Sequence, residues 1–380
     1  MARGVEEIID RPSLEKRLAS GKTLRVKHGI DPTSPNIHLG RSIPLLKLRD
    51  FQELGHKIVL IIGDFTGLIG DTSDKDSERP MLDEATVKAN LRTYIEQASK
   101  ILDTDAAEIR YNSEWLAPLG YGEIGKQADA FSVNAFIQRE NIRKRLDDGK
   151  RVSLREVLYP IMQGYDSVAV KADVELGGTD QRFNLLAGRE LQRLYKTDPQ
   201  DIVMGPLIEG FDGRKMSSSY GNTVNFMDEP NDMFGKMMST HDDLIIKYFT
   251  LLTRVPMDAV RDYEADLKRG ANPRDVKVRL AHEIVRMYHG DKDADGAEEY
   301  FKKTFTEHEI PKDIPEFKAK ERDVVSVLVD SKLVSSKSEA RRAIEQKGVK
   351  IDGATVEDPK IKVEKGSVLQ KGKIKFIRIV

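Results

Sequence analysis

The spacing of apolar and polar residues predicts strands and helices that alternate over the first 80 residues. Apolar residues alternate with charged ones over Thr23–Ile30, which predicts a strand. Apolar residues three positions apart predict a helix over Leu39–Leu54, and the continuous apolar run within His56–Asp64 predicts a strand buried on both faces. This order predicts a right-handed crossover in a parallel sheet. Before it, short helical pieces are expected on either side of Pro12.

The strand–helix–strand order returns after a long intervening segment. Residues 84–150 form a predicted helical insertion, in which a polar, glycine-rich break at 120–125 separates two amphipathic helices. Pro160 should kink the next helix or lie in its first turn. The predicted elements of this part are helices over Glu84–Leu102, Phe131–Asp148 and Arg155–Val170, a strand over Ala172–Thr179, a helix over Phe183–Tyr195 and a strand over Ile202–Ile208.

The last 150 residues change character twice. Helical patterns dominate residues 229–310, and the Pro- and Lys-rich stretch at 311–321 lacks periodicity, which predicts a linker. Within residues 322–380, Ser336–Glu339 has the pattern of a capping box, and Val349–Val356 alternates around Asp-Gly, which predicts a hairpin. The fold class expected is therefore α/β, with a parallel-sheet domain, an α-helical domain and a small α+β domain.

Composition and charge narrow the kinds of site and partner. The chain has 380 residues, 39% of them hydrophobic, and no cysteine, so it holds no disulfide, thiolate metal site or cysteine nucleophile. No apolar run approaches the roughly 20 residues of a membrane span, and residues 1–20 are too charged for a signal peptide, so a soluble, cytoplasmic protein is expected. Residues 331–380 carry a net charge of +7 and the remainder about −8. A basic tail on an acidic body favours a nucleic-acid partner over a merely solvated surface.

The loop between the first predicted strand and helix has the chemistry of an anion site. Asp31, Thr33 and their neighbours are typical of tight turns, and a helix N-terminus directs free backbone N–H groups toward this loop. His38 can donate to a phosphate, and Gly40 lets a flat group approach the backbone. Taken alone, His38 is more typical of a solvated histidine in a loop. Gly40 taken alone is more typical of a glycine that lets a helix pack closely against its neighbours.

Further polar loops follow the other predicted strands. Gly63–Asp71 and Gly177–Gln181 lie at the carboxyl ends of strands, where open α/β sheets bind ligands. Arg214–Ser219 joins two cations to three hydroxyls, which suits a polyphosphate. By itself this last loop is equally typical of a flexible surface loop.

Taken together, the loops match a known family. His38-Leu39-Gly40 and Lys215–Ser219 resemble the paired HIGH-type and KMSKS-type signatures of class I aminoacyl-tRNA synthetases. Tyr159–Asp166, with Gly63–Asp71 and Leu176–Gln181, is similar to the tyrosyl-tRNA synthetases of the bacterial type. The basic tail is similar to a small RNA-binding module shared by a small-subunit ribosomal protein and pseudouridine synthases.

This resemblance implies a domain plan and a reaction. It implies a Rossmann-like catalytic domain over 1–228, an α-helical anticodon-side domain over 229–310 and an RNA-binding domain over 322–380. The implied activity is that of a tyrosine–tRNA ligase, which forms tyrosyl-adenylate and pyrophosphate from ATP and L-tyrosine and then charges the 3′ end of tRNA(Tyr). The resemblance implies that Mg²⁺ accompanies the ATP. It implies no organic cofactor, no metal held by the protein alone and no membrane partner. A homodimer is implied through Phe131–Asp148.

The resemblance also implies a role for each motif residue. Thr33, His38 and Lys215 are implied as catalytic, because they contact the ATP phosphates as charge moves in the transition state. The implied ATP-binding residues are Asp31, Gly40, Arg41, Gly178, Asp180, Leu207, Ile208, Lys215, Met216, Ser217, Ser218 and Ser219. The implied tyrosine-binding residues are Lys27, Gly29, Thr66, Asp71, Tyr159, Gln163, Asp166 and Gln181, with Asp166 accepting from the phenolic hydroxyl.

Three residues depart from the family pattern. Lys27 stands where many members have a tyrosine that contacts the phenol, so the phenol site is expected to be built differently. Arg41 replaces the last histidine of the first signature, and Ser218 replaces the second lysine of the second, which leaves Lys215 as the main cation of its loop. We expect weaker coupling of that loop to ATP, or compensation by Arg41 or Arg214.

Three other functions fit part of the pattern. A tryptophanyl-type synthetase shares the fold, but Asp166 is placed to accept a phenolic proton. A synthetase-derived RNA-binding or splicing cofactor explains the basic tail but needs none of His38, Lys215, Asp180 and Asp71. Another class I nucleotidyltransferase, such as a pantothenate-type ligase, leaves the basic tail unexplained.

Overall fold

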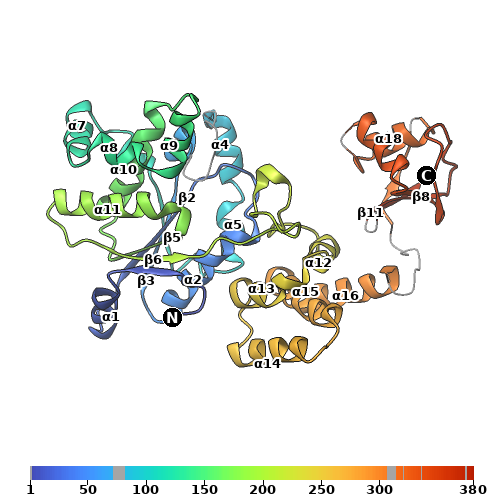
Figure 1. Ribbon diagram of the computed structural model, residues 1–380, viewed down its shortest axis with the longest axis horizontal. Helices are drawn as coiled ribbons and strands as arrows, with labels where there is room; N and C mark the ends of the chain where they lie inside the picture. The colour runs from blue at the N-terminus through green and yellow to red at the C-terminus, as the bar shows by residue number, and fades with distance from the viewer. Residues whose placement is uncertain (1, 72–81, 306–313, 320, 335, 373–374) are drawn as a thin grey trace. The chain divides into compact units, whose positions relative to one another are not determined.

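The computed structural model describes residues 2–71, 82–305, 314–319, 321–334, 336–372 and 375–380 (Figure 1). Contacts between residues divide the chain into two compact units. The first consists of Met1–Asp228 with Lys236–Gly290, and the second of Glu229–Gly235 with Asp291–Val380.

A six-stranded sheet forms the centre of the first unit, in the order β1-β6-β5-β2-β3-β4. The strands are β1 Glu7–Ile9, β2 Arg25–Ile30, β3 Lys57–Ile62, β4 Glu108–Tyr111, β5 Val174–Gly178 and β6 Asp201–Gly205. All neighbours are parallel except β1, which runs antiparallel to β6. In this register Lys27 of β2 lies opposite Val59 of β3 on one side and Glu175 of β5 on the other.

Two crossovers fix where the loops of this sheet meet. Helix α2 (Ser42–Glu53) connects β2 to β3, and α11 (Arg182–Leu194) connects β5 to β6. These crossovers lead away from each other, so right-handed connections place the two helices on opposite faces. The strand order therefore reverses between β2 and β5, which is the position where open α/β sheets bind ligands. The predicted parallel sheet and both crossovers are confirmed.

The structure corrects several predicted elements. Residues before Pro12 form strand β1 rather than a helix, and Pro12 lies in the first turn of α1 (Arg11–Ala19). The segment 84–150 is not wholly helical, because it contains β4, which pairs with β3 at the sheet edge. The glycine-rich break lies within helix α7 (Tyr121–Asp129). Pro160 lies inside α10 (Leu154–Ala169), beyond its first turn.

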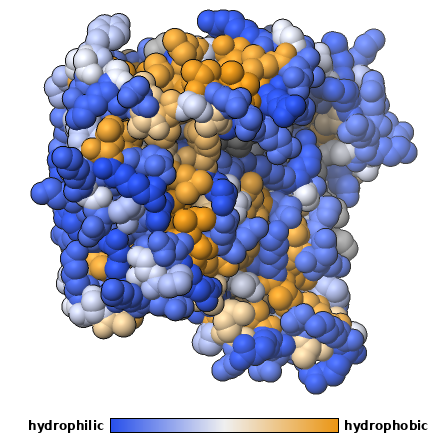
Figure 2. All heavy atoms as spheres, turned by 60° about the vertical axis from the view of Figure 1, so that its left-hand side comes forward, coloured by the Kyte–Doolittle hydropathy of each residue, from blue (hydrophilic) through white to orange (hydrophobic). Residues whose placement is uncertain are grey.

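The two long amphipathic helices predicted in the insertion are each divided. The first is split into α4 (Glu84–Leu91) and α5 (Tyr94–Ser99), and the second into α8 (Val133–Ile137) and α9 (Glu140–Asp147). Several apolar side chains of this region face solvent. Figure 2 brings this side of the molecule forward and shows apolar side chains gathered on its upper part. The exposed large apolar residues described in this region and at the start of α10 are Tyr111, Tyr121, Val133, Ile137, Leu146 and Leu154.

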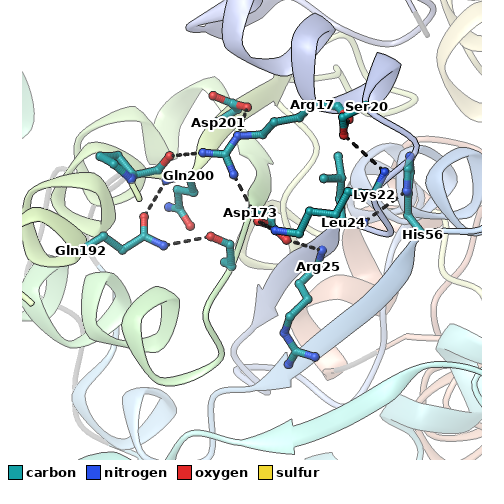
Figure 3. A network of polar contacts seen from close by, with 12 residues as sticks. Arg17, Ser20, Lys22, Leu24, Arg25, His56, Asp173, Gln192, Gln200 and Asp201 are labelled. Atoms are coloured by element: carbon teal, nitrogen blue, oxygen red, sulfur yellow. Dashed lines mark hydrogen bonds and ion pairs between the residues drawn. The ribbon is translucent and has the colours of Figure 1, made fainter. Parts of the chain in front are cut away.

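A polar network closes the amino ends of the central strands (Figure 3). Asp173, just before β5, accepts from Arg17 at 3.1 Å, from Lys22 at 3.0 Å and from the backbone N–H of Arg25 at 2.8 Å. Arg17 also pairs with Asp201 at 3.1 Å. The network therefore joins α1, β2, β5 and β6 at the end of the sheet opposite to the predicted ligand loops.

The remaining helices of the first unit complete its core. The segments are α3 Thr66–Ile69, α6 Ser113–Leu116, α13 Ile245–Leu252, α14 Met257–Lys268 and α15 Pro273–His289, and α12 (Pro230–Met238) spans the boundary between the units. Arg3 donates to four carbonyl oxygens around the carboxyl end of α13, those of Phe249, Thr250, Thr253 and Val255. This contact binds the amino terminus of the chain to the helical part of the unit.

The second unit ends in a small α+β fold. After α16 (Asp291–Phe305) come α17 (Val324–Asp330), α18 (Lys337–Glu345) and a sheet in the order β7-β11-β10-β8-β9. The strands are β7 Glu316–Phe317, β8 Val349–Ile351, β9 Ala354–Thr355, β10 Val368–Lys371 and β11 Lys375–Ile379. Ser336 caps α18 and Asp352-Gly353 forms the hairpin turn, as predicted. The predicted linker contains β7, while residues 311–313 and 320 lie outside the described part.

The described residues include no helix that is long and apolar enough to cross a membrane.

Candidate active site

A cavity of about 300 Å³ opens at the carboxyl ends of β2, β5 and β6. It lies at the strand-order reversal between β2 and β5. Among the predicted site residues, those that line it are Gly29, Asp31, Thr33, His38, Gly40, Arg41, Thr66, Asp71, Tyr159, Gln163, Asp166, Gly178, Asp180, Gln181, Leu207, Ile208, Lys215, Met216, Ser217 and Ser218. Two are not in the lining as described: Lys27 is buried below it, and the side chain of Ser219 lies outside the described atoms.

The loop from Asp31 to Arg41 is held from both sides. Its backbone pairs with residues 224–226, through Leu39 N–H to the Val224 oxygen at 2.8 Å and Phe226 N–H to the Ile37 oxygen at 2.9 Å. The helix that follows begins with a 3₁₀ turn, Leu39–Arg41, before α2. The loop is therefore a fixed rim of the cavity.

Gly40 and Arg41 shape this rim in different ways. A Cβ added to Gly40 would lie 3.0 Å from two ring atoms of His38, so only glycine lets the imidazole fold back here. Arg41 donates to the backbone oxygen of Asp31 at 3.1 Å and to Thr33 Oγ1 at 3.3 Å. The arginine that replaces the family histidine thus supports the loop from within, and its guanidinium lines the cavity.

Loop 209–222 forms the opposite rim. Buried Asn222 donates to the backbone oxygen of Lys215 at 3.0 Å and accepts from the N–H of Ser217 at 2.9 Å. It also donates to Asp212 at 2.8 Å, the main reason why the pKa of Asp212 falls to about 2. Lys247 of α13 pairs with Glu209 at 2.7 Å where the loop begins. These hydrogen bonds and this ion pair therefore hold the loop in place, which its polar, glycine-rich sequence did not indicate.

The two cations of this loop point to different places. Lys215 lies 3.4 Å from Asp180, across the cavity mouth. Arg214 pairs with Asp212 at 2.6 Å, its side chain is 62% exposed, and it does not belong to the cavity lining. Of the two arginines expected to compensate for Ser218, only Arg41 is therefore in position to do so.

Asp31 stands at the centre of the cavity. Its carboxylate accepts from Thr66 Oγ1 and from the Tyr159 hydroxyl, both at 2.8 Å. Removal from water raises the pKa of Asp31 to about 6, although both hydrogen bonds oppose this rise. Burial also raises the pKa of Tyr159 well above its usual value, so its hydroxyl remains a donor.

Gly63→Ala is expected to destabilise the protein by about 1–3 kcal/mol, the usual cost of overpacking. An added Cβ would lie 2.0 Å from Asp31 Oδ1 and 2.4 Å from Thr66 Oγ1, so this contact must open. The free energy of unfolding in denaturant measures the loss. Gly296→Ala in α16, where an added Cβ meets nothing within 4 Å, is the control. Equal stability of the two variants would contradict the close packing around Asp31.

Asp166 lies at the inner end of the cavity and is only 3% exposed. Its carboxylate accepts from Trp115 Nε1 at 2.8 Å and from Asn112 Nδ2 at 3.5 Å. Burial raises the pKa of Asp166 to about 7, against the opposing effect of the Lys27 charge. This side chain is thus an oriented acceptor that titrates near neutral pH.

A row of amides connects Asp71 to the inner end. Gln181 donates to Asp71 at 2.7 Å, and Asn184 donates to the side-chain oxygens of Gln181 at 2.9 Å and Gln163 at 3.1 Å. Fixed amides and carboxylates of this kind suit the ammonium group of an amino acid. Among the described residues, three or more His, Asp or Glu side chains nowhere gather as a metal site would require.

Sequence reasoning missed four residues that build the site: Asn112, Trp115, Glu175 and Asn222. Asn112 and Trp115 follow β4, a strand in a segment for which the sequence pattern predicts helices. Glu175 lines the cavity and pairs with Lys27 at 2.8 Å. The sequence predicts the strand that contains Glu175 and the glycine-containing loop that leads to Asn222. It does not indicate which side chains these two residues contact.

Known families match the chain over most of its length. The model described as "tRNA synthetases class I (W and Y)" matches residues 19–306, and the S4 domain model matches residues 322–369. Among solved structures, a mitochondrial tyrosyl-tRNA synthetase from Aspergillus nidulans has a TM-score of 0.68 at 21% identity, covering 80% of this chain and 92% of that one. A tryptophanyl-tRNA synthetase from Plasmodium falciparum has a TM-score of 0.60 at 14% identity, covering 78% and 82%. Both likenesses concern the fold alone.

Relatives aligned over the whole chain distinguish tyrosine from tryptophan. The tyrosine–tRNA ligase of Thermotoga maritima is 47% identical over 100% of this chain and 96% of its own length. That of Moorella thermoacetica is 46% identical over 100% and 94%. The S4 match extends this agreement to the basic tail, where the resemblance implied an RNA-binding module. The chain therefore belongs to the family of class I tyrosine–tRNA ligases.

Proposed function

We propose that the cavity activates L-tyrosine with ATP and that the same site then charges tRNA(Tyr). In the first step an oxygen of the tyrosine carboxylate attacks the α-phosphorus, the bond to the β-phosphate bridge breaks, and pyrophosphate leaves. In the second step a ribose hydroxyl at the tRNA 3′ end attacks the carbonyl and AMP leaves. The observation that carries the proposal is the convergence of motif residues from three strand ends on one cavity.

The rim between the two loops is the proposed ATP side. Thr33 and His38 donate to the phosphates from one loop, and Lys215 approaches from the other. Asp180 accepts from the ribose hydroxyls when Lys215 moves from it to the phosphates. Gly40 leaves room for adenine beside Ile208, which lies 3.4 Å from the position of a Gly40 Cβ. Fixed donors stabilise the charge that grows on the leaving pyrophosphate.

The inner half of the cavity is the proposed tyrosine side. Asp71, Tyr159 and Gln163 receive the ammonium group, and Asp166 accepts from the phenolic hydroxyl. A buried acceptor discriminates against phenylalanine because the carboxylate then loses a hydrogen bond that water cannot replace. Asp31 lies between the two halves, near the α-phosphate and the amino acid, and its carboxylate fixes the Tyr159 and Thr66 hydroxyls that donate to it.

Mg²⁺ is proposed to enter with ATP. The donors near the mouth of the cavity are hydroxyls, an imidazole and a lysine rather than a group of carboxylates, and phosphate oxygens are good ligands for this hard cation. The ion would neutralise phosphate charge, while the residues described above bind and orient the substrates.

The remaining parts of the chain are proposed to serve tRNA binding. In this plan residues 1–228 are catalytic, residues 229–310 lie on the anticodon side, residues 311–321 link, and residues 322–380 bind RNA through their basic surface. An S4 match and a net charge of +7 over residues 331–380 support the last assignment. A cytoplasmic location is proposed with this function.

A homodimer through Phe131–Asp148, the segment of α8 and α9, belongs to the same proposal. Within this segment Val133 is 70% exposed, and Ile137 and Leu146 are exposed as well. Tyr121 (94% exposed) and Leu154 (72%) flank the segment in the sequence. Figure 2 shows apolar side chains gathered on this side of the molecule, and a gathered set of exposed apolar side chains is typical of a protein interface rather than of a solvated surface. A second copy, related by a twofold axis, would cover the set with its own.

Val133→Asp is expected to weaken the dimer at least about tenfold, which corresponds to about 1.4 kcal/mol. The charge would be buried opposite apolar side chains of the second copy. Sedimentation velocity over a concentration series measures the shift toward monomer. Leu54→Asp, at another exposed apolar position (59% exposed) after α2, serves as the control and should leave the dimer intact. A dimer unaffected by Val133→Asp would place the interface elsewhere.

Charging of a tRNA(Tyr) transcript with labelled tyrosine tests the complete function. The full-length protein with ATP is expected to yield tyrosyl-tRNA in proportion to enzyme and time. Formation of tyrosyl-adenylate without transfer to tRNA would contradict the second step and favour a protein that retains activation alone.

A further inference from the structure

The side chain of Lys27 is wholly buried and has three acceptors. Its Nζ lies 2.8 Å from Glu175 Oε1, 2.8 Å from Ser167 Oγ and 3.2 Å from the backbone oxygen of Gln163. An ammonium group has three N–H donors, so these contacts use all of them. Lys27 therefore cannot replace the missing family tyrosine by binding the phenol itself.

Glu175 is equally committed. Besides Lys27, its carboxylate accepts from Ser167 Oγ at 3.1 Å and from the side-chain amide of Gln200. Gln200 belongs to the polar network at the amino ends of the strands (Figure 3). The pair is thus fixed between β2 and β5, directly across the register of the two strands.

The pair makes hydrogen bonds to the turn of α10 that contains Asp166. Gln163 and Ser167, the two α10 contacts of Lys27, lie three residues before and one residue after Asp166. The same part of this helix is packed tightly against α11, since a Cβ on Gly164 would lie 3.0 Å from the backbone of Ala187 and Gly188, and a Cβ on Gly188 would lie 2.9 Å from Ser167 Oγ. The position of Asp166 therefore depends both on the Lys27 contacts and on the packing of this turn against α11.

Among the described residues, groups from several elements act on Asp166. Lys27 from β2 favours its ionised form, and Glu175 from β5 opposes ionisation more weakly. Tyr159 of α10 feels the Asp166 charge and those of Asp31 and Asp71. On the β4 side Trp115 and Asn112 donate, and the Arg110 guanidinium lies 5.3 Å over the Trp115 ring.

We propose that the Lys27–Glu175 pair determines tyrosine specificity by positioning Asp166: it holds the Gln163–Ser167 turn in place and sets the charge beside the phenol acceptor. The proposal rests on the role of Asp166 in the proposed function. A merely structural part here would not need charge, because well-packed apolar residues commonly replace buried ion pairs without loss of stability. Lys27 and Glu175 act as positioning residues: Lys27 is buried below the cavity lining, and the Glu175 carboxylate is held by Lys27, Ser167 and Gln200.

Opposite pH shifts of two isosteric variants test the charge. In Glu175→Gln the Lys27 charge is unopposed, so the pKa of Asp166 falls and the acid limb of kcat/KM for tyrosine moves to lower pH by about 1 unit. In Lys27→Met the favourable charge is lost, so the limb moves to higher pH and the preference for tyrosine over phenylalanine falls. The KM for ATP should stay unchanged in both. The double variant should return the limb to an intermediate position.

Tyrosine-dependent ATP–pyrophosphate exchange between pH 5.5 and 9 is the measurement, with thermal unfolding as a check on folding. The proposal would be overturned if the acid limb of kcat/KM for tyrosine stayed in place in both variants, or if it moved in the same direction in both. If Lys27→Met fails to fold, Glu175→Gln decides alone, because an unmoved or alkaline-shifted limb overturns it. No exchange by the unmodified protein would overturn the proposed function as well, whereas normal exchange with unmoved limbs overturns only this inference.

Discussion

Replacing Asp166 by asparagine is expected to lower kcat/KM for tyrosine by about 10- to 150-fold, the equivalent of a hydrogen bond to a charged group worth about 1.5–3 kcal/mol. Asparagine preserves the shape but not the charge, and its amide presents donors as well as an acceptor. Phenylalanine makes no such bond, so its kcat/KM should change little. The preference for tyrosine should therefore fall by the same factor, as measured in amino-acid-dependent ATP–pyrophosphate exchange.

The same substitution should flatten a pH dependence. Burial raises the pKa of Asp166 to about 7, so its charged, accepting form prevails above that pH and is lost as the pH falls. The unmodified protein should therefore lose kcat/KM for tyrosine below about pH 7, and Asp166→Asn should not show this limb.

A matched control separates specificity from stability. Asp173→Asn removes a carboxylate at the opposite end of the sheet, where it joins Arg17, Lys22 and Arg25. It is expected to lower the free energy of unfolding but not the preference for tyrosine. If both variants reduced the preference equally, Asp166 would have no special part in recognising the phenol.

Lys215→Met is expected to slow tyrosyl-adenylate formation by about 10²–10³-fold, or about 2.7–4 kcal/mol, the usual effect of removing one oriented donor from a developing anion. Ser218 stands where the family pattern has a second lysine, so Lys215 is the one lysine of the loop signature. Single-turnover formation of adenylate under saturating ATP isolates this step. Lys215 contacts Asp180 until the phosphates draw its ammonium group away. The loss should therefore appear in the rate of adenylate formation rather than in ATP binding.

Arg214→Met is the neighbouring control. Arg214 pairs with Asp212, is mostly exposed and does not line the cavity. Its removal should leave adenylate formation nearly unchanged. Equal losses in the two variants would show that the loop acts through its total charge and not through the position of Lys215.

The sheet was predictable where hydrophobic spacing alone decides the structure. The strands at β2, β3, β5 and β6 and the crossovers α2 and α11 follow from apolar runs or from periodic apolar positions, and these apolar side chains are mostly buried in the finished sheet. Strand β4, with the sequence Glu-Ile-Arg-Tyr, has no apolar run, and its extended form depends on pairing with β3. Strand β1 likewise depends on β6. Such edge strands are specified by contacts distant in the chain.

The candidate site was predictable where its residues lie on loops at strand ends. The chemistry of Asp31, His38, Asp180 and Lys215 is visible in local motifs, and parallel strands bring their carboxyl ends together. The partners of these residues were not predictable. Trp115 reaches Asp166 only because β4 joins the sheet, and the charge on Lys27 has meaning only beside Glu175, which lies far away in the sequence.

The central claim is that this cavity forms the adenylate of tyrosine in preference to those of phenylalanine and tryptophan. Its most direct test is ATP–pyrophosphate exchange by the purified full-length protein with each of the three amino acids in turn. Exchange that depends on tyrosine, with much lower kcat/KM for the other two, is the result we predict. Exchange with none of them would contradict activation at this site, and preference for tryptophan would contradict the assignment of Asp166 as the acceptor of a phenolic hydroxyl.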